Sequence, residues 1–424
     1  MSTILGLAAR SAWNRRHNLV LMVIAIALST AMLLGVERLR HQIRQGFSQS
    51  ISGTDLVVGA RGSPTQLMLY TVFRLGSATN NMSWNSAQRL ASHPLVAWTI
   101  PMSLGDSHRG FPVLATTTDY FRHYQYGDRQ PLRIADGRPG LDGIFDTILG
   151  AEVARRLGYR LGDKIVLGHG SGMEAMGDEL KHADKPFVVT GILAPTGTPV
   201  DRTVHIGLAG MEAIHLDWQA GVPIPGMAIP AELVKKFDLT PKTVTGVLVG
   251  LKLRSRAFAV QSQIAEDQKE PLMAVLPGVA LDELWDIVGM IEKGLLLMSW
   301  MVVAVGLAGL MSSILAALGE RRRELAILRA MGARPRDVLM LLVAEGVCLM
   351  LVGTIAGYLL LSGVSFLAAG WLASTFGMAL PVVWPQASEL PVLAAIIAAG
   401  ALASLWPAFR AYRLSLSDGM TPHL

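Results

Sequence analysis

The feature that most constrains this chain is a short charged segment that lies between two long runs without charge. Residues 321–333 combine arginine and glutamate with leucine, isoleucine and methionine. The preceding run, residues 294–319, and the following run, residues 346–388, contain no Asp, Glu, Lys or Arg. Uncharged runs of this length are typical of transmembrane helices, because a charged side chain is costly inside a bilayer. We therefore expect the charged segment to lie at the membrane surface and to face the cytoplasm.

The composition also indicates a membrane protein. Hydrophobic residues make up 51% of the 424 residues and charged residues only 16%, whereas soluble domains carry about 25% charged residues. The net charge of +5 is interpreted as a signal for membrane orientation rather than for nucleic-acid binding, because the arginines cluster at a few sites. The single cysteine, Cys348, excludes an internal disulfide framework and a site of several thiolates.

Four apolar stretches are long enough to span a bilayer. The first, residues 18–36, would be roughly 28 Å long as an α-helix. We predict a membrane α-helical protein with four transmembrane helices and a large mixed α/β domain inserted between the first and the second. The predicted parts are an interfacial N-terminal helix (1–17), transmembrane helix 1 (18–36), a periplasmic domain (37–285), a stalk with transmembrane helix 2 (286–318), a cytoplasmic coupling loop (319–337), transmembrane helix 3 (338–362), a periplasmic loop (363–389), transmembrane helix 4 (390–409) and a cytoplasmic tail (410–424).

The distribution of arginine predicts the orientation. Cytoplasmic loops carry an excess of Lys and Arg, and neither residue occurs between Val338 and Phe409. We therefore place both termini and the loop 319–337 in the cytoplasm. The large domain would then lie outside, in the periplasm. The membrane would be the inner membrane of a bacterium. The first apolar stretch is interpreted as a retained anchor, because no small-x-small cleavage pattern follows it. The arginines that carry this prediction are Arg10, Arg15, Arg16, Arg321, Arg322, Arg323, Arg329, Arg334, Arg336, Arg410 and Arg413.

The large domain has the pattern of a mixed α/β fold. Alternating or β-branched apolar runs predict strands at residues 55–59, 147–150, 164–167, 187–193 and 247–253, and helices are predicted at 86–91, 151–157 and 258–267. An amphipathic helix predicted at 282–293 continues directly into the second transmembrane helix. That continuity would form a stalk.

The charged segment is predicted to be a coupling helix that contacts a separate protein. Its apolar side chains would pack in a groove of a soluble partner, where Glu324 and Arg329 would form ion pairs, and Gly332 would end the helix. The alternative is an inert basic loop that only fixes the topology, but such a loop does not need the interleaved apolar residues. The predicted coupling residues are Arg323, Glu324, Leu325, Ile327, Leu328, Arg329, Met331 and Gly332.

Two features of the third apolar stretch indicate contacts within a helix bundle. Glu345 lies inside it, where an isolated charge costs about 2.5–3.5 kcal/mol, so we expect this side chain to contact other protein groups. Gly353 and Gly357 have the spacing that allows close helix approach. The alternative is that they are glycines of the kind that membrane helices commonly contain.

Two segments of the large domain are candidate binding sites. Leu67, Leu69, Tyr70 and Phe73 either present a surface to an apolar substrate or pack inside the domain. The polar loop 169–184 contains histidines and carboxylates, but its spacing fits no standard metal site, so we interpret it as a solvated loop. The sequence also lacks the Gly-x-x-x-x-Gly-Lys-Ser/Thr, Gly-x-Ser-x-Gly and His-Glu-x-x-His motifs. We therefore predict no catalytic residue, no metal and no cofactor in this chain.

These features resemble the MacB/FtsX-like permeases of ABC transporters, which include lipoprotein-releasing permeases and macrolide exporters. Residues 320–333 are similar to the family's coupling segment, and residues 345–357 to its third transmembrane helix. Residues 148–165 and 187–201 are similar to a signature of its periplasmic core domain. The chain departs from the family after Arg413, where a Pro-x-x-Ala-Leu-Arg pattern is often found.

The resemblance implies a permease subunit that transmits ATP-driven motion of a separate ABC ATPase to its periplasmic domain. The motion would extract or export a lipoprotein, peptide or other amphipathic substrate. Implied partners are the ATPase, which binds ATP and Mg, a second permease chain in a homodimer or heterodimer, membrane lipid and a periplasmic protein, but no nucleic acid. Two other functions stay open: a signal transmitter that activates a periplasmic enzyme such as a cell-wall hydrolase, and a sensor that works without an ATPase.

Overall fold

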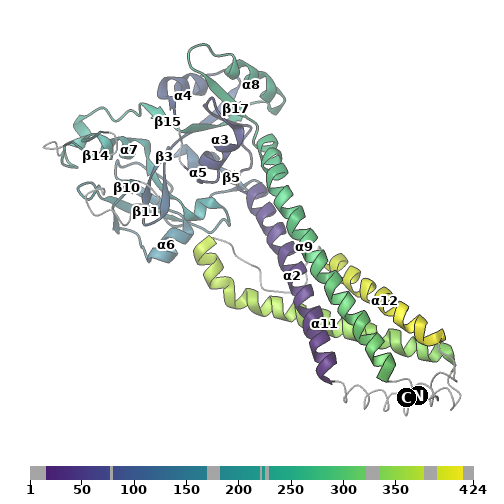
Figure 1. Cartoon of the computed structure of the whole chain (residues 1–424). Coiled ribbons are helices and arrows are strands. Elements are labelled where there is room, and N and C mark those ends of the chain that lie inside the picture. The colour runs from purple at the N-terminus through teal and green to yellow at the C-terminus, as the bar shows by residue number, and fades with distance from the viewer. Residues whose placement is uncertain are drawn as a thin grey trace. The chain divides into compact units, whose positions relative to one another are not determined.

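The computed structural model describes residues 16–76, 80–169, 182–219, 222–224, 229–320, 334–376 and 389–413. The chain, drawn in Figure 1, divides into two compact units. The helical unit contains residues 1–42, 289–373 and 380–424, and the α/β unit contains residues 43–288 and 374–379.

Among the described residues, four helices are long and apolar enough to cross a membrane. The apolar stretches are Arg16–His41, Gly289–Ala316, Arg336–Ala368 and Leu390–Phe409. They belong to the helices α2 (Arg16–Gln49), α9 (Pro277–Glu320), α11 (Pro335–Phe376) and α12 (Leu390–Arg413). The predicted fold class, four apolar helices with a mixed α/β domain between the first and the second, is confirmed.

The helices extend beyond the predicted transmembrane segments. Helix α11 reaches Phe376, so the first part of the predicted periplasmic loop 363–389 is helical. The predicted transmembrane helix 3 ends at residue 362 because a bilayer is usually spanned by a helix of that length. The helix itself ends only where its backbone hydrogen bonding is interrupted. The chain has no proline between Pro335 and Pro381, and proline is the strongest such interruption. The rest of that loop, the interfacial helix before Arg16 and the tail after Arg413 lie outside the described residues.

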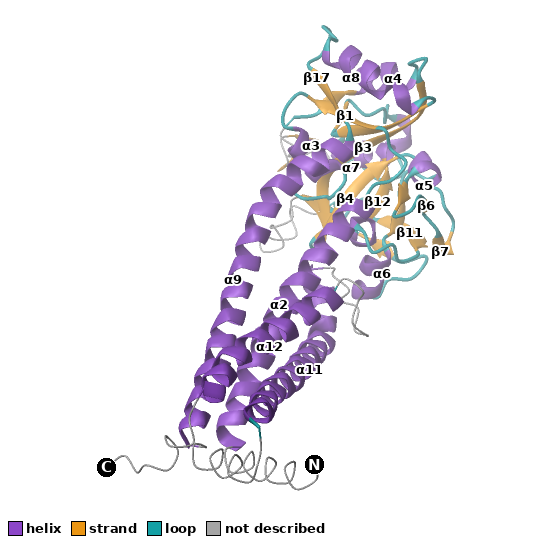
Figure 2. Cartoon of the chain, turned by 90° about the vertical axis from the view of Figure 1, so that its right-hand side faces the viewer, coloured by secondary structure: helices purple, strands orange, loops and turns teal. Residues whose placement is uncertain are grey.

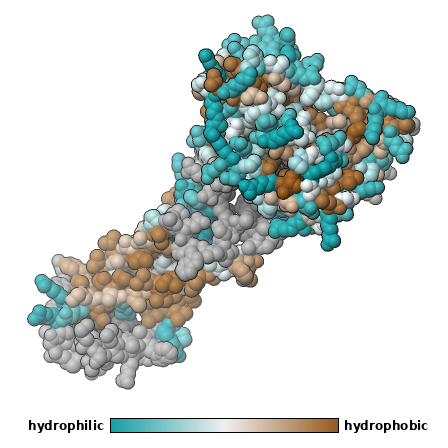
Figure 3. Space-filling view, turned by 180° about the vertical axis from the view of Figure 1, so that it is seen from behind, coloured by the Kyte–Doolittle hydropathy of each residue, from teal (hydrophilic) through white to brown (hydrophobic). Residues whose placement is uncertain are grey.

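The helical unit exposes many large apolar side chains. Met301 and Val305 of α9 are 62% and 73% exposed, and Leu367 of α11 is 83% exposed. Figure 3 shows hydrophobic residues gathered over the visible face of the described helices, whereas the visible face of the α/β unit is mixed. Water-soluble proteins rarely expose a large contiguous apolar surface, so this surface is suited to contact with lipid.

The α/β unit is built around one large mixed sheet (Figure 2). The strand order is β17-β1-β16-β3-β4-β12-β8-β11-β7, and β10 pairs with β3 and β9 with β11. Strands β4 and β12 pair in parallel, as do β8 and β11, while the other neighbours are antiparallel. The strands are β1 (Leu56–Ala60), β3 (Val96–His108), β4 (Phe111–Thr116), β7 (Ile134–Gly137), β8 (Asp146–Leu149), β9 (Lys164–Ile165), β10 (Gly168–His169), β11 (Phe187–Leu193), β12 (Val204–Gly207), β16 (Gly246–Leu251) and β17 (Leu272–Val275).

Short strand pairs lie outside this sheet. They are β2 (Met82–Ser83) with β15 (Thr243–Val244), β5 (Gln125–Tyr126) with β6 (Gln130–Pro131), and β13 (Trp218–Gln219) with β14 (Val222–Pro223).

Both faces of the large sheet are buried. Successive side chains of a strand point to opposite faces. In β1, Leu56 and Val58 therefore belong to one apolar core and Val57 to the other. Residues of α4, α6, α7 and α8 complete the first core, and residues of α3, α5 and the start of α9 complete the second. These helices are α3 (Pro64–Thr71), α4 (Trp84–Ala91), α5 (Asp119–His123), α6 (Ala151–Leu157), α7 (Leu208–His215) and α8 (Ala257–Ala265).

Candidate functional site

The predicted coupling segment lies outside the described residues. The described helices stop directly beside it, since α9 ends at Glu320 and α11 begins at Pro335. At the start of α11 the backbone N–H of Arg334 donates a hydrogen bond of 2.8 Å to the carboxylate of Asp337, which stabilises a helix N-terminus. The residues without a structural description are Arg323, Glu324, Leu325, Ile327, Leu328, Arg329, Met331 and Gly332.

The structure places Gly353 and Gly357 of α11 against α2. A Cβ atom at Gly353 would lie 2.5 Å from Cγ2 of Ile26, and a Cβ atom at Gly357 would meet the backbone carbonyl of Ala27. Real Cβ atoms do not approach other atoms so closely, so the contact between these two helices needs glycine at both positions.

A buried ion pair joins α2 to the residue that precedes α12. The guanidinium of Arg38 donates two hydrogen bonds to the carboxylate of Glu389, one from Nε to Oε1 and one of 3.2 Å from Nη2 to Oε2. The guanidinium also lies 5.2 Å from the ring centroid of Tyr358 in α11. Sequence reasoning missed this pair, although Arg38 follows the first apolar stretch and Glu389 precedes the fourth. In the predicted topology both positions lie at the same membrane surface, and this shared position could have predicted that the two charges pair.

The predicted intramembrane acid, Glu345, lies in α11 and is half-buried. Its neighbour Cys348 is exposed. Neither residue belongs to the Arg38–Glu389 pair.

The apolar segment considered as a substrate surface forms most of α3. Leu67 and Phe73 are buried in the second core of the α/β unit, while Leu69 and Tyr70 are half-buried. For Leu67 and Phe73 a substrate surface is therefore wrong. Leu67 points from α3 into this core, and Phe73 enters it from the turn that follows the helix, as the alternative of packing inside the domain requires.

The signature residues around 148–165 form a corner of the sheet. Gly150 lies between β8 and α6, and a Cβ atom there would collide with the backbone of Val200 and Asp201. Gly158 follows α6 with a φ of 73°, a left-handed conformation that favours glycine. These glycines are explained by backbone geometry, so they do not indicate a binding pocket.

The second half of the signature is a turn organised by Asp201. Its carboxylate accepts hydrogen bonds of 2.8 Å from the backbone N–H groups of Thr196 and Gly197. Burial raises the pKa of Asp201 above its usual value, and these hydrogen bonds oppose the rise only in part. The side chain therefore has a structural role in holding the turn against α6.

A buried ion pair also stabilises the α/β unit near α7. The ammonium of Lys185 is fully buried and lies 2.7 Å from both carboxylate oxygens of Asp217. Asp217 also accepts a hydrogen bond of 3.1 Å from the backbone N–H of Ile229. Burial raises the pKa of Asp217, but the hydrogen bonds from Lys185 and Ile229 outweigh it, so the pKa lies below its usual value.

Asp106, His182 and His215 form the group of side chains that could hold a metal ion within the described part of the chain. Of the polar loop 169–184, only His182 belongs to this group. The structure describes neither the side chain of His169 nor residues 170–181, so Glu174, Asp178 and Glu179 lie outside it.

Two family models of known proteins match this sequence. A model of the MacB-like periplasmic core domain matches residues 18–266, and a model of the FtsX-like permease C-terminal region matches residues 296–416. The curated proteins contain no match to this sequence.

Two solved structures show a distant likeness. The periplasmic region of MacB from Actinobacillus actinomycetemcomitans is 9% identical with a TM-score of 0.33, and the match covers 55% of this chain and 94% of that one. The extracellular domain of the noncanonic ABC-type transporter YknZ from Gram-positive bacteria is 10% identical with a TM-score of 0.27, and the match covers 53% of this chain and 98% of that one.

The two family models together identify a membrane permease of the ABC transporter class. Since the core-domain model matches more than half of the sequence, the chain belongs to the MacB/FtsX-like permease family.

Proposed function

We propose that this chain transmits ATP-driven motion of a separate ATPase to its α/β unit, in order to extract or export a lipoprotein, peptide or other amphipathic substrate. The ATPase would bind residues 321–333 and would supply ATP and Mg. A second permease chain would complete the complex. In this arrangement the chain lies in a bacterial inner membrane, with its termini in the cytoplasm and its α/β unit in the periplasm.

The observation that supports this proposal most directly is the covalent continuity of α9. Ala280, near its start, is buried in the second core of the α/β unit. The same helix ends at Glu320, directly before the predicted coupling segment. An unbroken helix is the stiffest connection that a single chain can form between two such points. A push on the segment would therefore act on the α/β unit through α9.

A helix-breaking substitution tests whether α9 transmits motion. Met290 is 76% exposed, so its side chain contributes little packing within the chain. Met290→Pro removes a backbone hydrogen bond and kinks the helix at a cost of about 3 kcal/mol or more, whereas Met290→Ala keeps the helix intact. In proteoliposomes that contain the permease and its ATPase, we expect Met290→Pro to hydrolyse ATP without releasing a fluorescent lipopeptide. Met290→Ala should release it. Equal release per ATP by both variants would contradict transmission through α9.

Substitutions in the coupling segment test contact with the ATPase. Leu328→Glu places a charge where an apolar contact is proposed, and Glu324→Lys reverses a charge. Both variants should remain in the membrane and lose ATP-dependent lipopeptide release. Permease that never copurifies with an ATPase would favour the sensor. ATP-dependent activation of a cell-wall hydrolase, with no lipopeptide release, would favour the signal transmitter.

A further inference from the structure

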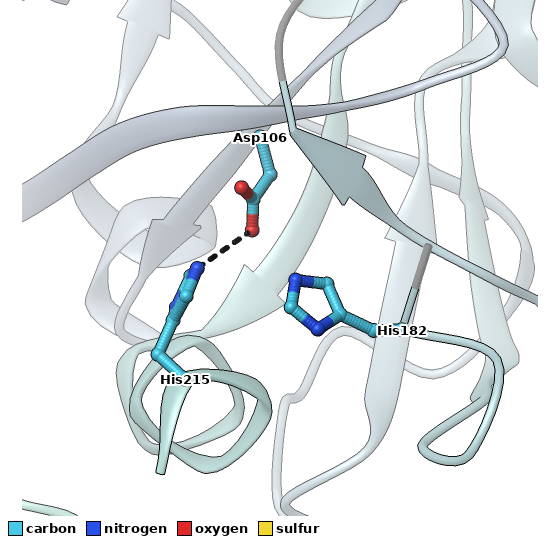
Figure 4. A group of neighbouring side chains, drawn as sticks. All are labelled: Asp106, His182 and His215. Carbon is cyan, nitrogen blue, oxygen red and sulfur yellow. Dashed lines mark ion pairs between the residues drawn. The ribbon is translucent and has the colours of Figure 1, made fainter. Parts of the chain in front are cut away.

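We propose that Asp106, His182 and His215 bind one divalent transition-metal ion of the Zn²⁺ type in the α/β unit. One ligand atom from each residue lies within 4.8 Å of the ligand atoms of the other two. Figure 4 shows the carboxylate and the two imidazole rings directed toward a common point. The three residues are far apart in the sequence and are brought together by the fold.

Each ligand is fixed by a different element. Asp106 lies near the end of β3 and is buried. His182 is fully buried, and its backbone N–H donates a hydrogen bond of 2.9 Å to the carbonyl of Leu167. His215 is the last residue of α7. A bound ion would therefore join β3, the chain before β11 and the end of α7.

The orientation of His215 is the one required for a metal ligand. Its Nδ1 lies 2.7 Å from the backbone carbonyl oxygen of Met211, one turn earlier in α7. Donation from Nδ1–H to this carbonyl makes Nε2 the nitrogen that faces the cluster, and in a neutral imidazole Nε2 carries the lone pair that binds a metal. Nε2 points toward Asp106, with 3.7 Å between Nε2 and Oδ2. Metal-bound histidines commonly make this kind of hydrogen bond through their second nitrogen.

The second imidazole is held by aromatic packing. The ring centroid of His182 lies 4.3 Å from that of Trp218 and 5.2 Å from that of His215. The His182 and His215 rings are nearly perpendicular, at 80°. Perpendicular rings can direct one nitrogen each to a shared ion without stacking against each other.

The distances are close to those of an occupied site. Ligand atoms bound to one zinc ion at about 2.0–2.1 Å lie roughly 3.3 Å from one another in a tetrahedral arrangement. The 3.7 Å between His215 and Asp106 is already near that value. The widest separation is at most 4.8 Å, so binding would draw the most distant ligand atoms together by about 1.5 Å.

The ligand types select the class of ion. Two imidazoles and one carboxylate suit Zn²⁺ and similar first-row metals, whereas Mg²⁺ and Ca²⁺ prefer ligand sets made of oxygen. Three protein ligands leave a fourth tetrahedral position for water or for a donor that arrives from solvent. The side chain of His215 is 32% exposed, which gives an ion access to the site.

Zinc binding to the full chain in detergent tests the proposal. The protein is prepared without a histidine tag and stripped with EDTA, and Zn²⁺ alone is the probe. Equilibrium dialysis followed by metal analysis should find one tightly bound zinc per chain in the wild type, which excess Mg²⁺ does not displace. His215→Ala removes a ligand at a partly exposed position and should weaken binding by at least about 10–100-fold, the loss that follows removal of only an outer-shell partner. His93→Ala, a half-buried histidine outside the cluster, is the matched control and should bind as the wild type does.

A spectroscopic measurement uses the same proteins. Co²⁺ in place of zinc should give the intense visible absorption of a tetrahedral site in the wild type and in His93→Ala, and should lose it in His215→Ala. The proposal is overturned if the wild type binds no zinc in the micromolar range, or if His215→Ala binds zinc as tightly as His93→Ala. Neither result depends on an ATPase, so the test is independent of the proposed function.

Discussion

The buried His205 is expected to make the α/β unit sensitive to acid. This residue lies in β12, an inner strand of the large sheet, where it is fully buried beside the rings of Tyr120 and Phe121. Its Nδ1 lies 3.1 Å from the carbonyl oxygen of Ile148. Burial, with a smaller contribution from the charge of Arg74, lowers the pKa of His205 from 6.5 to about 3. The folded protein therefore keeps this imidazole neutral.

The size of the effect follows from the difference between the two pKa values. Below about pH 6.5 the unfolded chain binds a proton that the folded chain does not bind, so stability falls as the pH falls. The free energy of unfolding should decrease by about 1.4 kcal/mol per pH unit between pH 6.5 and 3. The loss is about 2 kcal/mol between pH 6.5 and 4.5, and about 4–5 kcal/mol is the upper limit.

The assay compares the wild type with His205→Gln. Glutamine does not titrate in this range and keeps a polar amide in a side chain of similar volume. The midpoint temperature of thermal unfolding, Tm, is measured for the full chain in detergent between about pH 7 and pH 4.5. We expect the wild type to lose more Tm than His205→Gln does, and His93→Gln to follow the wild type. Parallel curves for the wild type and His205→Gln would refute the assignment of a depressed pKa to His205.

Three further substitutions each test a local feature of one unit, two in the helical unit and one in the α/β unit. Glu389→Ala leaves Arg38 buried without its carboxylate and should destabilise the helical unit by about 3–5 kcal/mol, measured by unfolding in detergent; an unchanged Tm would contradict the buried pair. Gly353→Leu should destabilise the contact between α2 and α11 by about 1–3 kcal/mol, whereas Gly363→Leu, where a Cβ atom meets nothing within 4 Å, should not; equal losses would argue against the contact. Gly158→Ala puts a Cβ atom on a residue with a φ of 73° in open space and should cost about 1 kcal/mol through backbone strain alone; no change in the free energy of unfolding would exclude the left-handed conformation.

The local pattern of the sequence predicts much of the fold. The strand predicted at 187–193 and the helix predicted at 151–157 coincide with β11 and α6. The helix predicted at 282–293 is part of α9. In each case the signal is carried by residues that are adjacent along the chain, such as an alternating apolar run or a glycine that ends a helix.

The end of a helix follows less directly from the sequence, for a physical reason. The thickness of a bilayer predicts that the third transmembrane segment ends at residue 362, whereas the helix that contains it continues to Phe376. Hydropathy reports which residues prefer lipid, whereas helix length depends on where backbone hydrogen bonding stops.

The sequence by itself determined the class of this protein, because the length of an apolar run and the positions of arginines are properties of neighbouring residues. It also determined the family, because the family's motifs are short patterns of neighbouring residues. Only the tertiary structure decided which distant residues meet. Arg38 and Glu389 pair because α2 and the residue before α12 lie together in the helical unit. Asp106, His182 and His215 come together because the fold of the α/β unit places the end of β3, the chain before β11 and the end of α7 side by side. Strand order and helix contacts depend on long-range packing, which no local pattern specifies.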